Sequence, residues 1–347
     1  MKKIYSLILV FAFVFSTNVP VFAWGEEGHR AVGAEAAAYL KPATLNRITQ
    51  ILLGDSIAGV SVWADTTKRR ADEDDLDPET KSFLANDKND KNDTWHYVDL
   101  PLDCPDYNSC EGFKRPDDIV QMINFSVRRL KTGKEDPQHP ISERNALRML
   151  IHLIGDMHMP FHVGAGFINE NDLSNILIET DPQRIRQFKF LDDQGGNKVV
   201  LKYKPILGKP EDPEREANLH FFWDVEIVQR LMFAAKRTRS PETFGRFLKE
   251  SITPENSWNA QGNDVYQWAS QWAADSLKQS KQSGYKNLRI TEKREREING
   301  RKVTDYLISR GDPAAYDAQA QETARTQIAK AGYRLAKMLE AIYQNRT

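Results

Sequence analysis

Apolar residues recur at three- and four-residue intervals along most of this chain, and this spacing constrains the fold more than any other feature. If such a segment is helical, the spacing gathers its apolar residues on one face. Eight segments show the pattern: Glu26 to Leu40, Ala43 to Leu53, Asp117 to Lys131, Ser142 to Met157, Pro213 to Lys236, Pro241 to Ser251, Trp258 to Ser280 and Pro313 to Gln344. The spacing therefore predicts a mainly α, compact fold with a few short strands and long loops.

Strand signals are sparse, and the best candidate is Lys198 to Tyr203, directly after the Gly195-Gly196 turn. Two polar stretches, Arg69 to Asp93 and Tyr285 to Lys302, are expected to be loops or extensions, because predicted helices flank both. Since neither stretch is typical of a linker, residues 24–347 are expected to form one domain.

The first 23 residues have the pattern of a cleavable secretory signal. Two lysines precede a mostly apolar run from Ile4 to Phe15, and Val21-Phe22-Ala23 resembles a cleavage site. The run is too short to span a membrane comfortably, and no later stretch approaches about 18 uninterrupted apolar residues. We therefore expect residues 1–23 to be removed. The mature chain is expected to begin at Trp24, to have no membrane anchor and to be a secreted or periplasmic monomer.

The formal net charge of the 347 residues is −1 at pH 7. A protein that held nucleic acid only through surface lysine and arginine would usually be strongly basic, because the affinity would come from neutralised phosphates. The composition therefore disfavours binding of nucleic acid through surface charge alone.

The two cysteines, Cys104 and Cys110, lie in a turn-rich segment of a chain expected to reach an oxidising compartment. A local disulfide is the predicted outcome. A thiolate metal site would need more cysteines at closer spacing.

Two His-x-x-x-Asp pairs occur on predicted helices in apolar surroundings: His152 with Asp156, and His220 with Asp224. Residues four apart project from the same helix face, so each pair can chelate a divalent metal, and nitrogen with oxygen ligands suits zinc. A single pair is more often an ordinary hydrogen bond on a helix. Two pairs, with His162 just beyond the Pro160 break, favour metal instead, because burying so many ionisable groups without an ion is costly.

His29, Asp65 and His96 are further candidates outside those two segments. Taken alone, each is more simply a polar core or surface residue. Trp24 changes their interpretation: if the signal is cleaved before it, its free α-amino group and its carbonyl oxygen become a bidentate ligand near His29.

The order of these motifs resembles one family. Trp24 with Gly-x-x-Gly-His29 is followed by Trp-Ala-Asp65, Trp-His96-Tyr, His152-x-x-x-Asp156-x-His-x-Pro-x-His162, Gly-Gly-Asn197 and Asn-Leu-His220-x-x-Trp-Asp224. The series resembles the zinc-dependent nucleases typified by the fungal nucleases S-one and P-one, which belong to the phospholipase C/nuclease superfamily. The resemblance implies a helical domain of that type with three zinc ions in a cleft.

The resemblance also implies a set of zinc ligands. One zinc ion is expected on Asp65, His96, His152 and Asp156, and a second on His162, His220 and Asp224. The third is expected on the amino and carbonyl groups of Trp24, on His29 and on the other oxygen of Asp156, which then bridges two metals. Three Zn²⁺ ions against three carboxylates leave three positive charges in the cleft, so phosphate is attracted without a basic surface.

The resemblance implies an exported endonuclease, a hydrolase of single-stranded DNA and RNA that releases 5′-phosphorylated products and has 3′-nucleotidase activity. A water bridging two zinc ions is expected to attack phosphorus, with Asp65, Lys68 and Asp156 in catalytic roles. The implied substrate contacts are Lys68 near the phosphate, Asn197 in the cleft, Tyr97 stacked on a base and Asp99 near the base edge. Stacking requires an unpaired base, which favours single strands.

Tyr97 departs from the family pattern, and His158 stands outside the implied ligand set. Tyr97 replaces an expected phenylalanine, which keeps the stacking face and adds a hydroxyl group. His158 matches a family position that is not a direct ligand, and it is expected at most to support one. Two other functions stay open on the sequence alone: a zinc-dependent phospholipase C of the same superfamily, and an exported zinc-binding protein without catalysis.

Overall fold

The computed structural model describes residues 24–67, 75–89, 92–209, 211–236, 240–298 and 300–344. The predicted signal segment, residues 1–23, and Lys68 lie outside these ranges. None of the helices in the described ranges is both long enough and apolar enough to cross a lipid bilayer.

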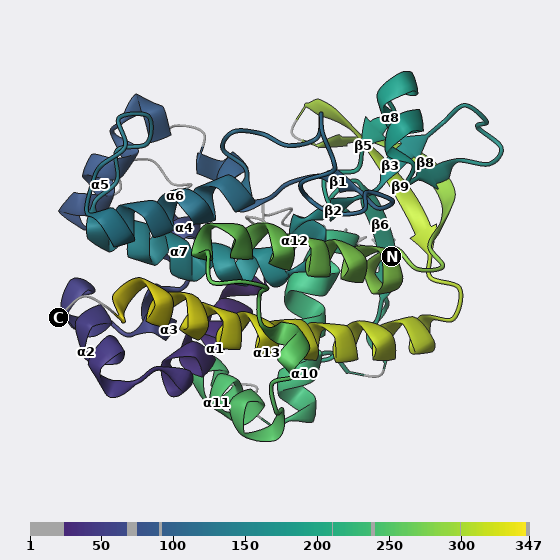
Figure 1. Cartoon of the computed structure of the whole chain (residues 1–347). Coiled ribbons are helices and arrows are strands. Elements are labelled where there is room, and N and C mark those ends of the chain that lie inside the picture. Colours follow the sequence, from purple (N-terminus) through teal and green to yellow (C-terminus); the bar gives the residue numbers. More distant parts are fainter. Residues whose placement is uncertain are drawn as a thin grey trace, which may run out of the picture.

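Helices dominate the described chain, which confirms the predicted mainly α fold (Figure 1). The longer helices are α1 (Gly25–Tyr39), α2 (Pro42–Ile51), α6 (Ile119–Thr132), α7 (Glu143–His158), α11 (Pro241–Ser251), α12 (Trp268–Gln279) and α13 (Pro313–Tyr343). The shorter ones are α3 (Ile57–Val60), α4 (Trp63–Thr66), α5 (Pro78–Leu84), α8 (Pro182–Phe188), α9 (Leu219–Phe221) and α10 (Val228–Ala234). Single 3₁₀ turns are η1 (Asp87–Asn89), η2 (Asn92–His96), η3 (Pro160–His162), η5 (Asn256–Trp258) and η6 (Val265–Gln267), and π-helical turns are η4 (Phe222–Ile227) and η7 (Ser280–Gly284).

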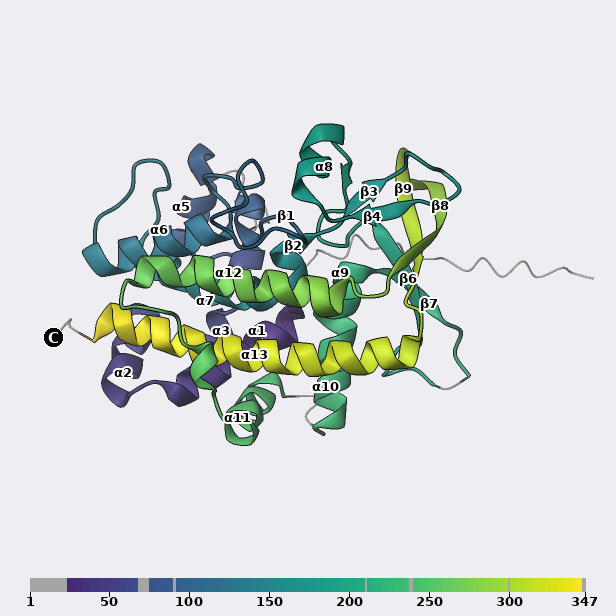
Figure 2. The same cartoon turned by 45° about the vertical axis from the view of Figure 1, so that its right-hand side comes forward.

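Helices α1 and α7 bring the apolar faces of the other helices together. Helix α1 packs against α3, α11 and α13, and α7 packs against α6, α12 and α13. In both views α12 and α13 run side by side across one face of the molecule (Figures 1 and 2). Every residue of α7 from Asn145 to His158 is buried, so the polar side chains that it carries lie inside the core.

The strands of the two larger sheets lie together at one end of the helical assembly, and the short strands β1 and β2 lie nearer its middle (Figure 2). A parallel pair joins β1 (Leu100–Pro101) to β2 (Gly164–Ala165). A three-stranded sheet has the order β4 (Leu177–Glu179), β3 (Phe167–Asn169), β5 (Leu191–Asp192), and a four-stranded sheet has the order β7 (Arg215–Asn218), β6 (Val199–Tyr203), β9 (Arg301–Ser309), β8 (Arg289–Ile298). Strand β6 confirms the prediction for Lys198 to Tyr203.

Two predicted helices begin later in the structure than expected. The segment predicted from Pro213 first forms β7, and its helix begins at Leu219 because the Asn218 side chain accepts a hydrogen bond from the Phe221 amide, at 2.7 Å, as an N-cap. The segment predicted from Trp258 becomes a continuous helix only at Trp268, because Gly262 has a left-handed backbone with φ of 78° that interrupts it.

The two polar stretches contain more regular structure than expected. The first includes α5, where Asp77 caps the helix start by accepting from the amides of Glu79 and Thr80. The second forms the long antiparallel strands β8 and β9. Cross-strand pairs of charged and β-branched side chains stabilise such a ribbon even where no apolar face is continuous.

A buried acid lies where α1 meets α13. Glu35 is fully buried, and neither of its carboxyl oxygens has a hydrogen-bond partner among the described residues. It approaches α13 so closely that a Cβ at Gly332 would lie 2.7 Å from it. Burial raises the pKa of Glu35 well above its usual value.

We expect Glu35→Gln to be more stable than the wild type at higher pH, by a margin that grows as the pH rises. The folded state keeps a proton on Glu35 after the unfolded chain has released it near pH 4.5, so wild-type stability falls from that pH upward to the raised folded pKa. The loss is about 1.4 kcal/mol per pH unit within that window, and glutamine avoids it. Denaturant unfolding of both proteins across this range measures the difference, and parallel stability curves would contradict the assignment.

Candidate metal centre

The candidate site is built around one buried face of α7. His152 and Asp156 lie one turn apart on this face and have no exposed surface. Three further elements bring ligand-type side chains to it: His29 from α1, Asp65 from α4 and His96 from η2. The site thus joins residues from four separate parts of the sequence.

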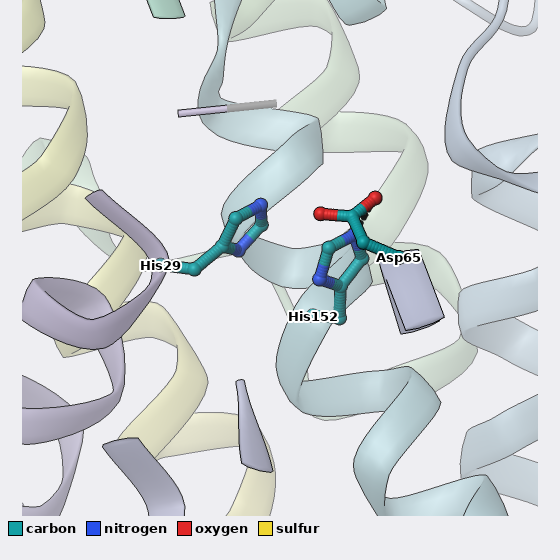
Figure 3. Close-up of side chains that lie close together, drawn as sticks. All are labelled: His29, Asp65 and His152. Atoms are coloured by element: carbon teal, nitrogen blue, oxygen red, sulfur yellow. Dashed lines mark ion pairs between the residues drawn. The ribbon is translucent and has the colours of Figure 1, made fainter. Parts of the chain in front are cut away.

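His29, Asp65 and His152 form the first of three groups whose ligand atoms all lie within 4.8 Å of one another. The His29 and His152 rings are stacked, with centroids 4.0 Å apart and planes 13° from parallel. Nε2 of His152 lies 3.7 Å from Oδ1 of Asp65. Figure 3 shows the three side chains converging from different helices.

Asp156 stands between two sides of this cluster. Its Oδ2 lies 2.8 Å from Nδ1 of His96 and 3.1 Å from Nε2 of His152, and these three residues form the second group. Its Oδ1 faces the other way, 3.1 Å from Nε2 of His29. The two oxygens of one carboxylate therefore serve two neighbouring sets of nitrogen atoms.

His162, His220 and Asp224 form the third group. The Nε2 atoms of the two imidazoles are 3.1 Å apart, and Nε2 of His220 is 3.1 Å from Oδ2 of Asp224. Asp224 lies in the π-helical turn η4, which directly continues the short helix carrying His220. A π-turn of this kind often re-aims side chains at a functional site.

Main-chain carbonyls orient three of the histidines. Nδ1 of His152 lies 2.7 Å from the Ser61 carbonyl oxygen. Nδ1 of His162 and Nδ1 of His220 lie at the same distance, 2.7 Å, from the carbonyl oxygens of His96 and Gly195, respectively. A carbonyl oxygen only accepts, so each Nδ1 carries the proton and donates it. In the neutral ring, each Nε2 then directs an unshared electron pair into the cluster, which is the arrangement found in metal-ligating histidines.

When both rings are neutral, His162 and His220 each place an acceptor Nε2 toward the other, a contact that a cation would relieve. Against the effect of burial, the Asp224 carboxylate raises the pKa of His220. Burial lowers the pKa of His162 to about 3, so its ring is neutral. Burial opposes ionisation of Asp156, but His152 and His162 outweigh it and hold the pKa of this carboxyl well below its usual value.

The residues fit a zinc site. His29 Nε2, Asp156 Oδ1 and Asp224 Oδ2 are buried and have no hydrogen bond from the described residues, although each has a ligand-type atom 3.1 Å away. Tetrahedral zinc, with bonds of about 2.0–2.2 Å, places its ligand atoms about 3.3–3.6 Å apart. The donor set of nitrogen and oxygen without thiolate is one that zinc accepts.

Trp24 begins the described chain at the edge of this cluster. Its side chain is fully buried, its main-chain nitrogen donates to Oδ1 of Asp224 at 3.1 Å, and its carbonyl accepts from the Gly28 amide at 2.9 Å. Glycine is required at position 28, because a Cβ there would lie 2.5 Å from the Trp24 Cβ. The main-chain nitrogen of Trp24 is therefore held beside Asp224, and its carbonyl takes part in the first turn of α1.

Tyr97, Asp99 and Asn197, three of the predicted substrate-contacting residues, lie on segments that adjoin the third group, whereas Lys68 lies outside the described residues. The chain carrying Tyr97 and Asp99 runs beside His162, because the Val98 amide donates to the His162 carbonyl at 2.9 Å. Asn197 follows the Gly195-Gly196 turn, and its Nδ2 donates to the Gln194 carbonyl at 2.8 Å. Burial, together with the nearby Asp192 carboxyl, raises the pKa of Asp99 well above its usual value.

Arg115, which was not among the residues predicted for the site, supports Tyr97. The Arg115 guanidinium lies 4.7 Å from the centre of the Tyr97 ring, and its Nη2 donates to the carbonyls of Thr94 and Tyr97 at 2.6 and 3.0 Å. This cation–π contact covers one face of the aromatic ring. Arg115 lies 18 residues beyond Tyr97 in an irregular segment, and no local pattern signals the contact.

His158 lies apart from the three groups. Its Nδ1 donates to the Ile154 carbonyl at 2.7 Å, and its Nε2 accepts from Nη1 of Arg334 at 3.0 Å. Burial and the neighbouring Arg334 charge lower the pKa of His158 to about 3. The neutral ring therefore forms part of a buried polar network between α7 and α13.

The predicted disulfide between Cys104 and Cys110 is present, with the two Cα atoms 5.7 Å apart. It closes the turn-rich segment that follows β1.

The fold and the site define a class of protein: a helical fold around buried histidine and aspartate groups that could hold metal ions. Residues 24–344 match the S1/P1 nuclease family, and the chain belongs to that family. It is 24% identical to nuclease S1 of Aspergillus oryzae over 92% of each chain, and 24% identical to nuclease P1 of Penicillium citrinum over 92% of this chain and 98% of the relative. It is also 24% identical to endonuclease 1 of Arabidopsis thaliana over 82% of each chain. Membership makes the chain a nuclease, a hydrolase whose substrates are nucleic acids.

Proposed function

We propose that this nuclease is an exported, zinc-dependent endonuclease that hydrolyses single-stranded DNA and RNA to 5′-phosphorylated products and also acts as a 3′-nucleotidase. The observation that carries the proposal is the convergence of unprotonated imidazole nitrogens and unpartnered carboxylate oxygens in one buried cluster. Such a cluster suits cations that bind a phosphodiester.

Nine residues are proposed to hold three zinc ions. Asp65, His96, His152 and Asp156 form one site, and His162, His220 and Asp224 form the second. The third uses the amino and carbonyl groups of Trp24, with His29 and Oδ1 of Asp156. Bound zinc would supply a water of lowered pKa and would stabilise charge on the phosphoryl oxygens.

The side chains around the cluster are proposed to position the substrate. Tyr97 offers a ring face for a base, Asp99 lies near the base edge, and Asn197 and Lys68 contact the strand beside the phosphate. Asp156 keeps its charge at neutral pH and holds its two oxygens toward separate sites. Because stacking needs an unpaired base, this arrangement favours single strands.

Export is proposed from the first 23 residues. Removal of residues 1–23 would convert the Trp24 peptide nitrogen into a free amino group, and the family match begins at this residue. The remaining residues, 24–347, are proposed to act as one domain and as a monomer.

We expect Tyr97→Ala to weaken binding of single-stranded oligonucleotides by about 1–3 kcal/mol for the lost stacking contact. Tyr97→Phe keeps the ring and is expected to bind nearly as the wild type does. Fluorescence titration of the zinc-loaded proteins with a labelled oligonucleotide whose backbone resists hydrolysis measures both affinities. Equal affinities of the alanine and phenylalanine variants would remove Tyr97 from the binding site.

The proposed function is tested by incubating zinc-loaded protein that begins at Trp24 with single-stranded DNA, RNA, duplex DNA and phosphatidylcholine. Rapid digestion of both single strands to 5′-phosphorylated products, with intact lipid, is expected. Hydrolysis of phosphatidylcholine alone would identify a phospholipase C. Tightly bound zinc without any hydrolysis would identify a zinc-binding protein.

A further inference from the structure

We infer that Asp193, held by Tyr285, is a positioning residue that aims the His220 imidazole at its metal. The inference rests on the proposed function, because it takes His220 as a metal ligand. Neither Asp193 nor Tyr285 touches the three ligand groups directly, and the link runs through the Gly195-Gly196 turn.

The turn contacts His220 at two points. The Gly195 carbonyl accepts from Nδ1 of the imidazole at 2.7 Å, and the Gly196 carbonyl lies 3.4 Å from the His220 main-chain amide, which donates to it. The first contact sets which ring nitrogen carries the proton and in which direction Nε2 points. The position of the turn therefore determines the orientation of the ligand.

Asp193 fixes the position of this turn. Its side chain is fully buried, and Oδ1 accepts from the amides of Gly196 and Gly166, at 3.0 and 3.1 Å. The main-chain amide of Asp193 donates to the Gly166 carbonyl at 3.0 Å. The main-chain carbonyl of Asp193 accepts from the Lys198 amide, also at 3.0 Å. Both ends of the turn are thus tied to one residue.

Tyr285, after the π-helical turn η7, completes the anchor. Its hydroxyl group lies 3.0 Å from Oδ1 and 2.8 Å from Oδ2 of Asp193, and its ring packs 5.0 Å from that of Phe161. Gly195 packs so closely against Phe161 that a Cβ at this position would lie 2.2 Å from the Phe161 carbonyl oxygen. The Asp193 carboxyl and the Tyr285 hydroxyl are supports of the turn that substitutions can remove without adding atoms to this contact.

Oδ1 can accept both amides whether or not the carboxyl is protonated. Burial raises the pKa of Asp193 to about 7, so both forms exist near neutral pH. Asparagine has a carbonyl oxygen in the same place and a side-chain amide that can donate to the Tyr285 oxygen. Asp193→Asn should therefore preserve the anchor, whereas Asp193→Ala removes it and leaves two buried amides without acceptors.

The test compares zinc binding by full processed protein and its variants, measured by competition with a chromophoric chelator. Asp193→Ala is expected to weaken binding of one zinc ion, the one proposed on His162, His220 and Asp224, by about 10- to 100-fold, as loss of an outer-shell partner does. Asp193→Asn should restore wild-type affinity. Tyr285→Phe, which removes one hydroxyl and keeps the ring, should weaken the same ion by a smaller factor and serves if the alanine variant does not fold.

Asp118→Ala is the matched control. Asp118 is also a fully buried carboxylate that accepts from three main-chain amides, those of Arg115, Val120 and Gln121, and from the Tyr107 hydroxyl. It caps α6, and none of these hydrogen bonds involves a histidine. Its loss should lower stability while leaving all zinc affinities unchanged.

A second readout does not depend on metal. Nitrogen-15 NMR of the histidine rings in metal-free protein should show His220 with its proton on Nδ1 in the wild type and in Asp193→Asn, and a mixture of tautomers in Asp193→Ala. If folded Asp193→Ala binds zinc as tightly as the wild type and keeps the same His220 tautomer, the role of Asp193 is refuted, and the proposed function is unaffected. Absence of zinc binding by the wild type would instead refute the proposed function.

Discussion

Asp156→Asn is expected to abolish nuclease activity and to lower the zinc content of the protein. Asp156 directs Oδ1 toward His29 and Oδ2 toward His96 and His152, so one substitution weakens two proposed zinc sites. Metal ions contribute several kcal/mol to stabilising charge in the transition state, which corresponds to a loss of about a thousandfold or more. Initial rates on single-stranded DNA and zinc per chain, measured on the same sample, give both quantities.

Asp312→Asn provides the control for this change. Asp312 caps α13 by accepting from the amides of Ala314 and Ala315, and asparagine caps helices equally well. Its zinc content and rate should equal those of the wild type. Near-normal turnover by Asp156→Asn would contradict the bridging role.

Any residue retained before Trp24 is expected to remove one zinc ion and most of the activity. A peptide nitrogen does not bind zinc as a free amino group does, because its electron pair is delocalised into the carbonyl. The Trp24 nitrogen is buried near Asp224, so an added residue would also occupy the space around the cluster. Zinc per chain should fall from three to two, and the rate should fall on the order of a hundredfold.

The comparison needs two proteins with the same added residues, one before Trp24 and one after Thr347. The extension after Thr347 should leave zinc content and rate unchanged. Full activity with three zinc ions in the protein extended before Trp24 would rule out the proposed amino-group ligand.

The helices were predictable because their signals are local. The helix predicted from Pro241 to Ser251 has those bounds in the structure, and Ser240 caps it at the start. Strand β6 also depends on a partner distant in sequence, because it pairs in parallel with β9, where Val199 lies opposite Tyr306. The hairpin of β8 and β9 did have a local signal, the dipeptide Asn299-Gly300, which favours tight turns.

The site was predictable only in part from spacing. The helical period alone places His152 beside Asp156 and His220 near Asp224. The proximity of His29 and Asp65 to them depends on how α1 and α4 pack on α7, and only the family resemblance suggested it. Arg115 and Asp193 act through a ring face and a turn, and neither contact has a sequence pattern.

The charge of the site explains how a nearly neutral chain can act on nucleic acid. The formal net charge is −1, and the buried carboxylates alone would repel phosphate. The proposed cations reverse that sign inside the site. Metal removal should therefore abolish binding of the phosphodiester as well as its hydrolysis.

Zinc analysis coupled to activity, on one sample that begins at Trp24, tests the central claim most directly. We predict three zinc ions per chain and rapid digestion of single-stranded DNA and RNA. Both should be lost after treatment with a chelator and regained when zinc is added back. Undiminished hydrolysis by protein shown to contain no zinc would contradict the account.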